Sequence, residues 1–434
     1  MVSQVSAGSF IRLDMQKELP SSPYATFLQL KKKLPCNLSE LPTPCLLVDE
    51  EIVKKNCSLM LEKAAAAGVH LRPHVKTHKC HQIAKMQVGG DTSKGIVAST
   101  LPEVRCMAAH GFTDITYGVP VTARRLAPLL GICSDYPSTR LSILVDSQEQ
   151  VDKIEDLYTE PIAAALIEQY RDFYNATLFG CFLKIDVGYH RAGVDVIADP
   201  SSAVALARKI HASKALLFRG IYSHSGNAYA ATNAEAIAIS HSECTHAKNF
   251  ADALKAANIP CECISVGSTP SCAAADTFPG ATEIHPGNYV FFDRQQMAVP
   301  VCALEQVAVR VLTTVIGHYQ THILCDAGSL AISKDLAPQD SSFGSVEATD
   351  LLLTAVSQEC GKLQTCSTLP KSRDTSANLI QEETRPPIHF DSYPRGSLLK
   401  IIPNHSCLTA ACHPFYFVMR GQDVIDVWEP CRGW

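Results

Sequence analysis

The sequence predicts an α/β protein, a (β/α)8 barrel of the TIM type followed by a C-terminal domain that is mainly β. Short apolar or β-branched runs alternate with helix-length stretches over the middle of the chain, and strand-like sequence dominates from about Gln295 onward. At 434 residues the chain exceeds the usual size of a single hydrophobic core. We therefore expect two domains.

The barrel segment is expected over residues 43–294. A short apolar run at 46–49 precedes a helical pattern from Glu50 to Ala67, which ends at Gly68 as a helix with a glycine C-cap would. Strand candidates then recur at 69–75, 96–99, 114–117, 141–145, 181–186, 217–223, 263–266 and 283–285. Helical stretches separate most of them, for example 101–110, 123–133, 202–212 and 234–257. This alternation is typical of a parallel barrel, whose chemistry lies at the C-terminal ends of the strands.

Residues 295–434 predict the mainly β domain. Its strand candidates cover 306–316, 322–326, 398–402 and 415–418. Residues 361–395 are rich in Ser, Thr, Pro and charge, so we expect a long loop excursion there. Residues 1–42 show little repeat character, and we expect this N-terminal segment to pack on the β domain rather than to trail free.

Composition excludes several kinds of partner. With 38 Lys+Arg against 43 Asp+Glu the formal charge is −5, which gives no electrostatic reason to bind nucleic acid or an anionic membrane. The sequence has no signal-peptide core and no apolar run of membrane-spanning length. The 18 cysteines form no CxxC pair, so we expect most of them to be reduced core residues. These features predict a cytoplasmic protein that acts on small molecules.

Lys76 carries the first chemical signal. It lies in RPHVKTHK, residues 72–79, at the end of the first strand candidate of the barrel. Its cationic neighbours, Arg72 and Lys79 among them, should lower the pKa of its amine and make it a better nucleophile toward an aldehyde. The alternative is a basic loop on a solvated surface, but polar, glycine-rich and imidazole residues also collect at the other strand ends.

Gly267, Ser268 and Thr269 form a candidate phosphate cup. They follow a strand candidate, and Pro270 can begin the next helix, so free backbone N–H groups and two hydroxyls would converge on one phosphate. No Walker loop and no GxGxxG pattern accompanies them, which argues against a nucleotide. A lysine and a phosphate cup on one barrel are what pyridoxal 5'-phosphate requires.

His405 and Cys407, in PNHSC at 403–407, are candidate zinc ligands. If the preceding strand continues through them, both side chains lie on one face and offer a nitrogen and a thiolate to one ion. Two protein ligands leave open positions, as a Lewis-acid site needs. The alternatives are a buried cysteine beside a hydrogen-bonded histidine, and a competing pair formed by Cys412 and His413.

Several ordered motifs between residues 43 and 420 resemble the eukaryotic D-serine dehydratase family. They are TPCLLVD, RPHVKTHK, KIDVGYHRAG, IYSHSGNAY, SVGSTP, EIHPGNYVFFD, CDAGSLAISKD, SQECG and PNHSC. That family belongs with the alanine racemase-like, fold type III pyridoxal phosphate enzymes and is related to D-threonine aldolase. The resemblance implies a homodimer, because fold type III sites commonly lie between subunits. One departure is Cys360, where relatives often carry histidine.

The resemblance also implies roles for individual residues. Lys76 is similar to the Schiff-base lysine of the family, and Tyr222 and Tyr229 to its cofactor contacts. The phosphate cup matches Gly267, Ser268 and Thr269, and the zinc ligands match His405 and Cys407. The aldolase typically has a carboxylate at the second ligand position, so Cys407 favours the dehydratase.

The expected reaction is the conversion of D-serine to pyruvate and ammonia. Lys76 would remove the α-proton, and zinc would assist loss of the β-hydroxyl. Two alternatives remain open. An aldolase acting on D-threonine or another 3-hydroxy-D-amino acid would use the same lysine but release glycine and an aldehyde, and a non-catalytic pyridoxal phosphate-binding protein would need no metal pair.

Overall fold

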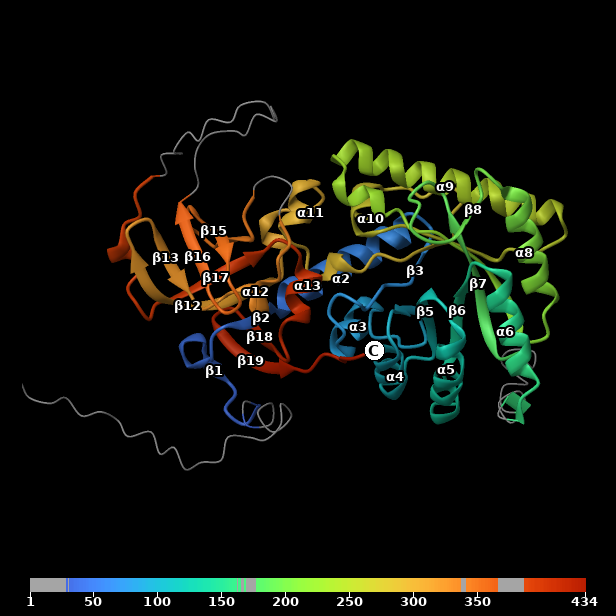
Figure 1. Ribbon diagram of the computed structural model, residues 1–434, viewed down its shortest axis with the longest axis horizontal. Helices are drawn as coiled ribbons and strands as arrows, with labels where there is room; N and C mark the ends of the chain where they lie inside the picture. The colour runs from blue at the N-terminus through green and yellow to red at the C-terminus, as the bar shows by residue number, and fades with distance from the viewer. Residues whose placement is uncertain are drawn as a thin grey trace, which may run out of the picture.

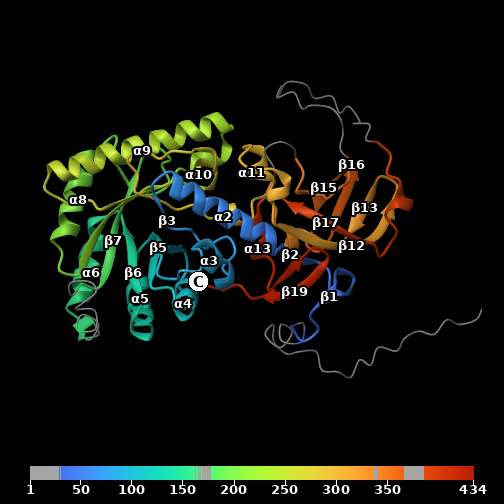
Figure 2. The same ribbon diagram turned by 180° about the vertical axis from the view of Figure 1, so that it is seen from behind.

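The computed structural model describes residues 29, 31–161, 163–164, 168, 177–336, 341–365 and 386–434. A barrel of strands with helices outside it lies beside a sheet domain, and the two views of Figures 1 and 2 show helix α2 (Glu50–Ala66) running between them. None of the helices in these ranges has the length and apolar character needed to cross a membrane.

Eight parallel strands form the barrel within the described residues, in the order β3-β11-β10-β9-β7-β6-β5-β4. Their bounds are β3 (His70–Leu71), β4 (Ile96–Ala98), β5 (Asp114–Pro120), β6 (Arg140–Val145), β7 (Phe179–Asp186), β9 (Leu216–Tyr222), β10 (Cys263–Val266) and β11 (Glu283–Ile284). A parallel bridge from His74 to Val97 joins the continuation of β3 to β4. The predicted TIM-like barrel is confirmed, strand by strand.

Helices between these strands cover the outside of the barrel (Figure 1). They include α3 (His81–Gln87), α4 (Leu101–Ala109), α5 (Ala123–Asp135), α6 (Gln148–Tyr158), α8 (Pro200–Ala212), α9 (Asn233–Ala256) and α10 (Thr269–Ala274). Side-chain caps fix several starts. The Asp49 carboxylate accepts from the N–H of Ile52 at the start of α2, and Thr232 forms a capping box with Glu235 at the start of α9. A short strand, β8 (Val194–Asp195), pairs with β7.

The second domain is a sheet of ten strands among the described residues, in the order β1-β19-β18-β2-β12-β13-β16-β15-β14-β17. Their bounds are β1 (Cys36–Asn37), β2 (Cys45–Asp49), β12 (Val309–Tyr319), β13 (His322–Cys325), β14 (Gly344–Val346), β15 (Leu351–Val356), β16 (Gly361–Thr365), β17 (Leu398–Pro403), β18 (Tyr416–Arg420) and β19 (Asp423–Trp428). Three short helices accompany it: α11 (Arg294–Ala298), α12 (Ser329–Ile332) and α13 (Ser406–Ala411). The predicted C-terminal β domain is confirmed.

Two expected boundaries need correction. Strand β2 pairs with β12 and β18 of the second sheet, so the barrel segment begins after it rather than at residue 43. A local apolar run cannot show which sheet it joins, because that pairing is set by strands hundreds of residues away. The expected excursion at 361–395 begins too early, since 361–365 are strand β16, and residues 366–385 lie outside the described ranges. The pairing of β1 with β19 places the described end of segment 1–42 on the β domain.

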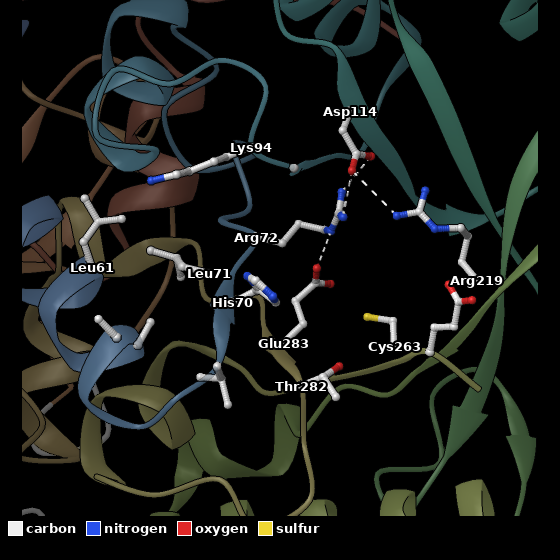
Figure 3. Close-up of a pocket in the computed structure, with 15 residues that line it drawn as sticks. Leu61, His70, Leu71, Arg72, Lys94, Asp114, Arg219, Cys263, Thr282 and Glu283 are labelled. Atoms are coloured by element: carbon white, nitrogen blue, oxygen red, sulfur yellow. Dashed lines mark hydrogen bonds and ion pairs between the residues drawn. The ribbon is translucent and has the colours of Figure 1, made fainter. Parts of the chain in front are cut away.

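The end of the barrel opposite to Lys76 is held by a buried ion network (Figure 3). The Arg72 guanidinium donates from Nε to Glu283 at 2.8 Å and from both terminal nitrogens to Asp114 at 3.0 Å. Arg219 lies 3.8 Å from the same aspartate. These groups line a cavity of about 660 Å³, and its innermost charges neutralise one another. The network therefore secures the strand starts, which in a TIM-like barrel serve stability.

The C-terminal segment returns from the sheet domain to the barrel (Figure 1). Cys431 forms a disulfide with Cys106 of α4, and its N–H donates to the carbonyl of Lys79 at 2.8 Å. Arg432 donates to the carbonyls of Ala410 and Ala411 at the end of α13. The segment thus ties together α4, the loop after Lys76 and α13. This pair is an exception to the expectation of reduced cysteines.

Buried neutral histidines should make stability depend on pH. Burial lowers the pKa of His78 and of His413 to about 4, against about 6.5 for an exposed imidazole. The folded protein resists protonation of these two imidazoles. Their contribution to the free energy of unfolding is therefore complete above pH 6.5 and is lost as the pH falls toward 4. Between pH 7 and pH 5 we expect the His413→Gln variant to lose about 2 kcal/mol less of its unfolding free energy than the wild type.

Urea unfolding at the two pH values measures this difference. The exposed His211→Gln provides the matched control and should keep the wild-type loss. If the wild type and His413→Gln lose the same unfolding free energy between the two pH values, His413 is not the buried neutral imidazole that makes stability depend on pH.

Candidate active site

Lys76 lies at the C-terminal mouth of the barrel, two residues after the bridge that closes it. Its amine has a lowered pKa, chiefly because burial disfavours the ammonium form and also because Arg191 is near. The predicted direction is therefore confirmed, but the expected causes are wrong. Arg72 points to the opposite end of the barrel, and Lys79 is neutralised by Glu103 at 2.6 Å.

Three imidazoles lie near this amine, the buried His74 and His285 and the partly buried His224. The pKa of each is well below the usual value, because burial and the neighbouring cations both disfavour a further positive charge. Hydrogen bonds fix two of their tautomers. Nδ1 of His224 donates to the Gly267 carbonyl at 3.1 Å, whereas Nδ1 of His74 accepts from the N–H of Lys76 at 3.3 Å. The histidines are neutral and directional, so they can position a ligand without repelling a lysine.

Tyr222 ends strand β9 and stacks on His285, with ring centroids 4.0 Å apart. The imidazole Nε2 of His285 is buried and lacks a hydrogen-bond partner among the described residues. A buried acceptor or donor without a partner is costly, and such atoms gather where a ligand belongs. The predicted cofactor contact at Tyr222 thus lies beside an unused polar atom.

The residues of the candidate phosphate cup lie together where strand β10 ends and helix α10 begins. Gly267 has φ +109°, and a Cβ there would collide with the sulfur of Cys272, so only glycine fits. The Thr269 hydroxyl accepts from the N–H groups of Gly287 and Asn288 at 3.2 and 2.8 Å. The buried phenol of Tyr229 also hydrogen-bonds to Thr269, which brings a residue from the preceding strand-end loop to the cup.

Hydroxyl groups extend the cup beyond the predicted residues. Ser225 lies 3.0 Å from Ser271 and 3.4 Å from Ser268, Oγ to Oγ. Sequence reasoning did not select Ser225 or Ser271. The sequence held a signal for both residues. Ser225 lies in the IYSHSGNAY motif, and Ser271 lies in the helix that begins at the cup. The hydroxyls of Ser225, Ser268 and Ser271 thus lie together at the start of α10, next to Gly267.

His405 and Cys407 lie together, but not on a strand. Strand β17 ends at Pro403, His405 is the N-cap of α13, and Cys407 is in its first turn. The strand alternation expected here is therefore wrong. The two side chains nevertheless hydrogen-bond to each other across the helix start.

The electrostatics of this pair favour an imidazolium beside a thiolate. Burial alone would lower the pKa of His405, but hydrogen bonds to Asp335 and to the thiolate raise it to about 11. Burial would likewise raise the pKa of Cys407, but His405, Thr77 and Asn288 lower it. A thiolate and an imidazole are the donor set that zinc prefers. Across the described residues, no group of three or more His, Cys, Asp or Glu side chains forms a metal-binding cluster.

Cys407 also contacts the lysine loop. Its sulfur lies 3.2 Å from the hydroxyl of Thr77, the residue after Lys76, and 3.3 Å from Nδ2 of Asn288. The structure therefore brings together the lysine and the His405–Cys407 pair, which are more than three hundred residues apart.

The competing pair, Cys412 and His413, has a structural role, since His413 hydrogen-bonds to the carbonyl of Ala331 at 2.8 Å. Cys360 lies between β15 and β16 of the sheet domain.

Asp293 holds α13 against the barrel, a role that sequence reasoning missed. Its Oδ2 accepts from the N–H of Ser406 and from Nδ2 of Asn288, each at 2.9 Å. Its Oδ1 accepts from the N–H of Gln296 at 2.9 Å. The aspartate ends the motif EIHPGNYVFFD, so the motif itself was the available signal. Asp335, 3.7 Å from Nδ1 of His405, had no comparable signal.

This arrangement of barrel, strand-end lysine and β domain defines the alanine racemase-like class of proteins. The alanine racemase N-terminal domain matches residues 48–295, and the putative serine dehydratase domain matches residues 308–419. The chain belongs to this family, and within it to the branch of the D-serine dehydratases. Solved alanine racemases share the fold at low identity, for example that of Bacillus anthracis at 12% identity and a TM-score of 0.61.

Two relatives cover nearly the whole chain. The D-serine dehydratase of Dictyostelium discoideum is 34% identical, and the alignment covers 92% of this chain and 98% of the relative. The D-threo-3-hydroxyaspartate dehydratase of Delftia sp. (strain HT23) is also 34% identical, over 92% of this chain and 99% of the relative. A solved structure of that dehydratase has a TM-score of 0.78 and 32% sequence identity, and the match covers 92% of this chain and 100% of that structure.

Proposed function

We propose that this protein is a D-serine dehydratase, a lyase that uses pyridoxal 5'-phosphate and zinc to convert D-serine to pyruvate and ammonia. The observation that carries the proposal is the contact between Cys407 and Thr77, which sets the proposed zinc ligands beside Lys76. Full-length relatives named D-serine dehydratase support it.

Pyridoxal phosphate suits the residues present. The cup around Gly267 admits a phosphate at close range, and Tyr229, Thr269 and Ser225 offer hydroxyl donors. Lys76 would anchor the aldehyde, and Tyr222 with His285 would line the ring. When bound, the cofactor supplies an electron-accepting ring that stabilises the negative charge left by loss of the α-proton.

The chain's own groups account for proton transfer. A lowered pKa keeps more of the Lys76 amine neutral at physiological pH, and a neutral amine can accept the α-proton of the substrate. The three neutral imidazoles around it add no positive charge that would oppose its later protonation. Burial thus prepares the base without a dedicated activating residue.

Zinc suits His405 and Cys407. As a Lewis acid with open coordination positions it would offset the negative charge that develops on the departing β-hydroxyl. Asp335 would orient the imidazole, as carboxylates commonly do for zinc-bound histidines. A solved structure of a D-threo-3-hydroxyaspartate dehydratase is described as a mutant in the metal-free form.

We further propose a homodimer in the cytoplasm, with D-serine as the main substrate and D-threonine as a second. The apolar side chains of Leu330, Leu336 and Leu408 are exposed around α12 and α13, next to the zinc pair. An exposed apolar surface of this kind is typical of a subunit interface. The negative charge and the small-molecule site give no reason to expect nucleic acid or membrane as partners.

Replacing the lysine tests the cofactor assignment. We expect Lys76→Ala to lose the visible absorbance of bound cofactor and to lower turnover by about 10³-fold or more, because both anchor and base are removed. The matched control is Lys79→Ala, which removes a lysine that is ion-paired with Glu103 and should retain both signals. Absorbance and turnover that survive in Lys76→Ala would reject the assignment.

Metal removal tests the zinc pair. Chelation should suppress elimination while the cofactor absorbance persists, and added zinc should restore the rate. His405→Ala and Cys407→Ala should each lose stoichiometric zinc and about 10²-fold or more of activity. Cys412→Ala should keep both, since its thiol hydrogen-bonds to backbone groups, among them the carbonyls of Ser329 and Leu408. An unchanged rate after verified metal removal would contradict the zinc role.

Product analysis separates the dehydratase from its alternatives. Purified protein given D-serine should release pyruvate and ammonia in equal amounts. Glycine and an aldehyde from D-threonine would instead identify an aldolase, and bound cofactor without turnover of either substrate would identify a non-catalytic protein. Adding D-threo-3-hydroxyaspartate to the assay tests whether the specificity named for the Delftia relative applies here.

A further inference from the structure

A buried carboxyl group lies directly behind the phosphate cup, and the proposed reaction does not use it. Glu243 projects from α9 and is only 2% exposed. Its Oε1 accepts a hydrogen bond from the hydroxyl of Ser223, at the end of β9. Its Oε2 is fully buried and makes no hydrogen bond of good geometry among the described residues. Ser225 and the Gly267 N–H, both part of the cup, face the same carboxyl.

The other ionisable groups that face Glu243 do not neutralise it. Lys184 of β7 is the cation that acts on the Glu243 carboxyl. No ion pair joins the two side chains within the described chain. The Lys184 amine instead donates to the carbonyls of Ile185 and Tyr222. Burial lowers the pKa of Lys184 to about 8. Tyr222, Cys244 and Cys272 also face the carboxyl, and burial raises the pKa of each of these, so all three are neutral.

A phosphate in the cup would place a second negative charge next to this carboxyl. Two anions in a water-poor interior repel strongly, and the weaker acid then takes up a proton. Burial already raises the pKa of Glu243, although the nearby hydroxyls of Ser223 and Ser225 act to lower it. The buried carboxyl, whose pKa is already raised, is therefore the candidate to take up that proton.

The proton also changes what Ser225 can do. Toward an ionised Glu243 the Ser225 hydroxyl can only donate, because a carboxylate only accepts. Toward a protonated Glu243 the hydroxyl can accept, which leaves its own hydrogen for the cup. One proton on Glu243 therefore turns Ser225 into a donor for the phosphate.

We propose that Glu243 is a positioning residue of the cofactor site that takes up one proton when the phosphate binds and thereby directs the Ser225 hydroxyl toward it. The inference rests on the proposed function, because it requires pyridoxal phosphate in this cup. It predicts that cofactor affinity and proton uptake are linked through one side chain.

Calorimetry of pyridoxal 5'-phosphate binding to the full-length apoenzyme tests the proposal. Titrations in two buffers of different ionisation enthalpy give the number of protons taken up. The wild type should take up about one proton more than Glu243→Gln, whose neutral amide keeps the affinity. As the pH rises, the wild-type affinity for the cofactor should fall about tenfold per pH unit more steeply than that of the variant. This difference should appear between the pKa of Glu243 in the free protein and its pKa in the complex.

Pyridoxal, which lacks the phosphate, is the matched ligand and should show no difference between the two proteins. Equal proton uptake from pyridoxal 5'-phosphate in both proteins would overturn the proposal. A Glu243→Gln variant that folds normally by circular dichroism but binds the cofactor more than tenfold more weakly would also overturn it, because an ionised carboxylate would then be required. Failure of the wild type to bind pyridoxal 5'-phosphate at all would instead refute the proposed function and this inference with it.

Discussion

The active site depends on one carboxylate that joins the two domains. Asp293 follows the last barrel strand, yet it accepts the N–H of Ser406 at the first turn of α13 in the β domain. The first N–H groups of a helix have no partner within it, and here the partner comes from the other domain. Because His405 and Cys407 flank Ser406, this bond sets their distance from Lys76. Asn288 reinforces the junction, since its amide donates to Asp293 and to the sulfur of Cys407.

Burial, rather than neighbouring charge, sets the electrostatics on the barrel side of the site. Lys76 and the imidazoles of His74, His224 and His285 all have lowered pKa values, and in each case burial is the largest cause. On the β-domain side, burial is again the largest single cause for His405 and Cys407, but the hydrogen bonds and charges of their neighbours together outweigh it. Burial thus favours the neutral form of the groups around Lys76, whereas the neighbours of His405 and Cys407 favour the charged forms of that pair. This contrast suits a reaction that removes a proton at one atom and a hydroxyl at the next.

The candidate site residues selected from the sequence lie together in the structure, but the local geometry of some of them differs from the expected one. Lys76 and the phosphate cup were found because each follows a strand, and strand ends of a parallel barrel share one mouth. The pair His405 and Cys407 was selected because a strand was expected to continue through both residues. That reason is wrong, since the strand ends before His405 and helix α13 begins there. Spacing by two residues fits a strand face, but it also fits the N-cap and first turn of a helix. Hydrogen bonds to Asp335 and Thr77, which no local pattern contains, decide between them.

The sequence by itself determined the alternation of strands and helices, the family, and the candidate residues of the site. These follow from local patterns: periodicity, glycine at a positive φ, and short motifs. Only the tertiary structure decided that β2 joins the second sheet, that Asp293 docks α13, and that Glu243 lies behind the cup. Each of these rests on contacts between residues far apart in the chain. Such contacts depend on how whole elements pack, and packing leaves little trace in any one segment.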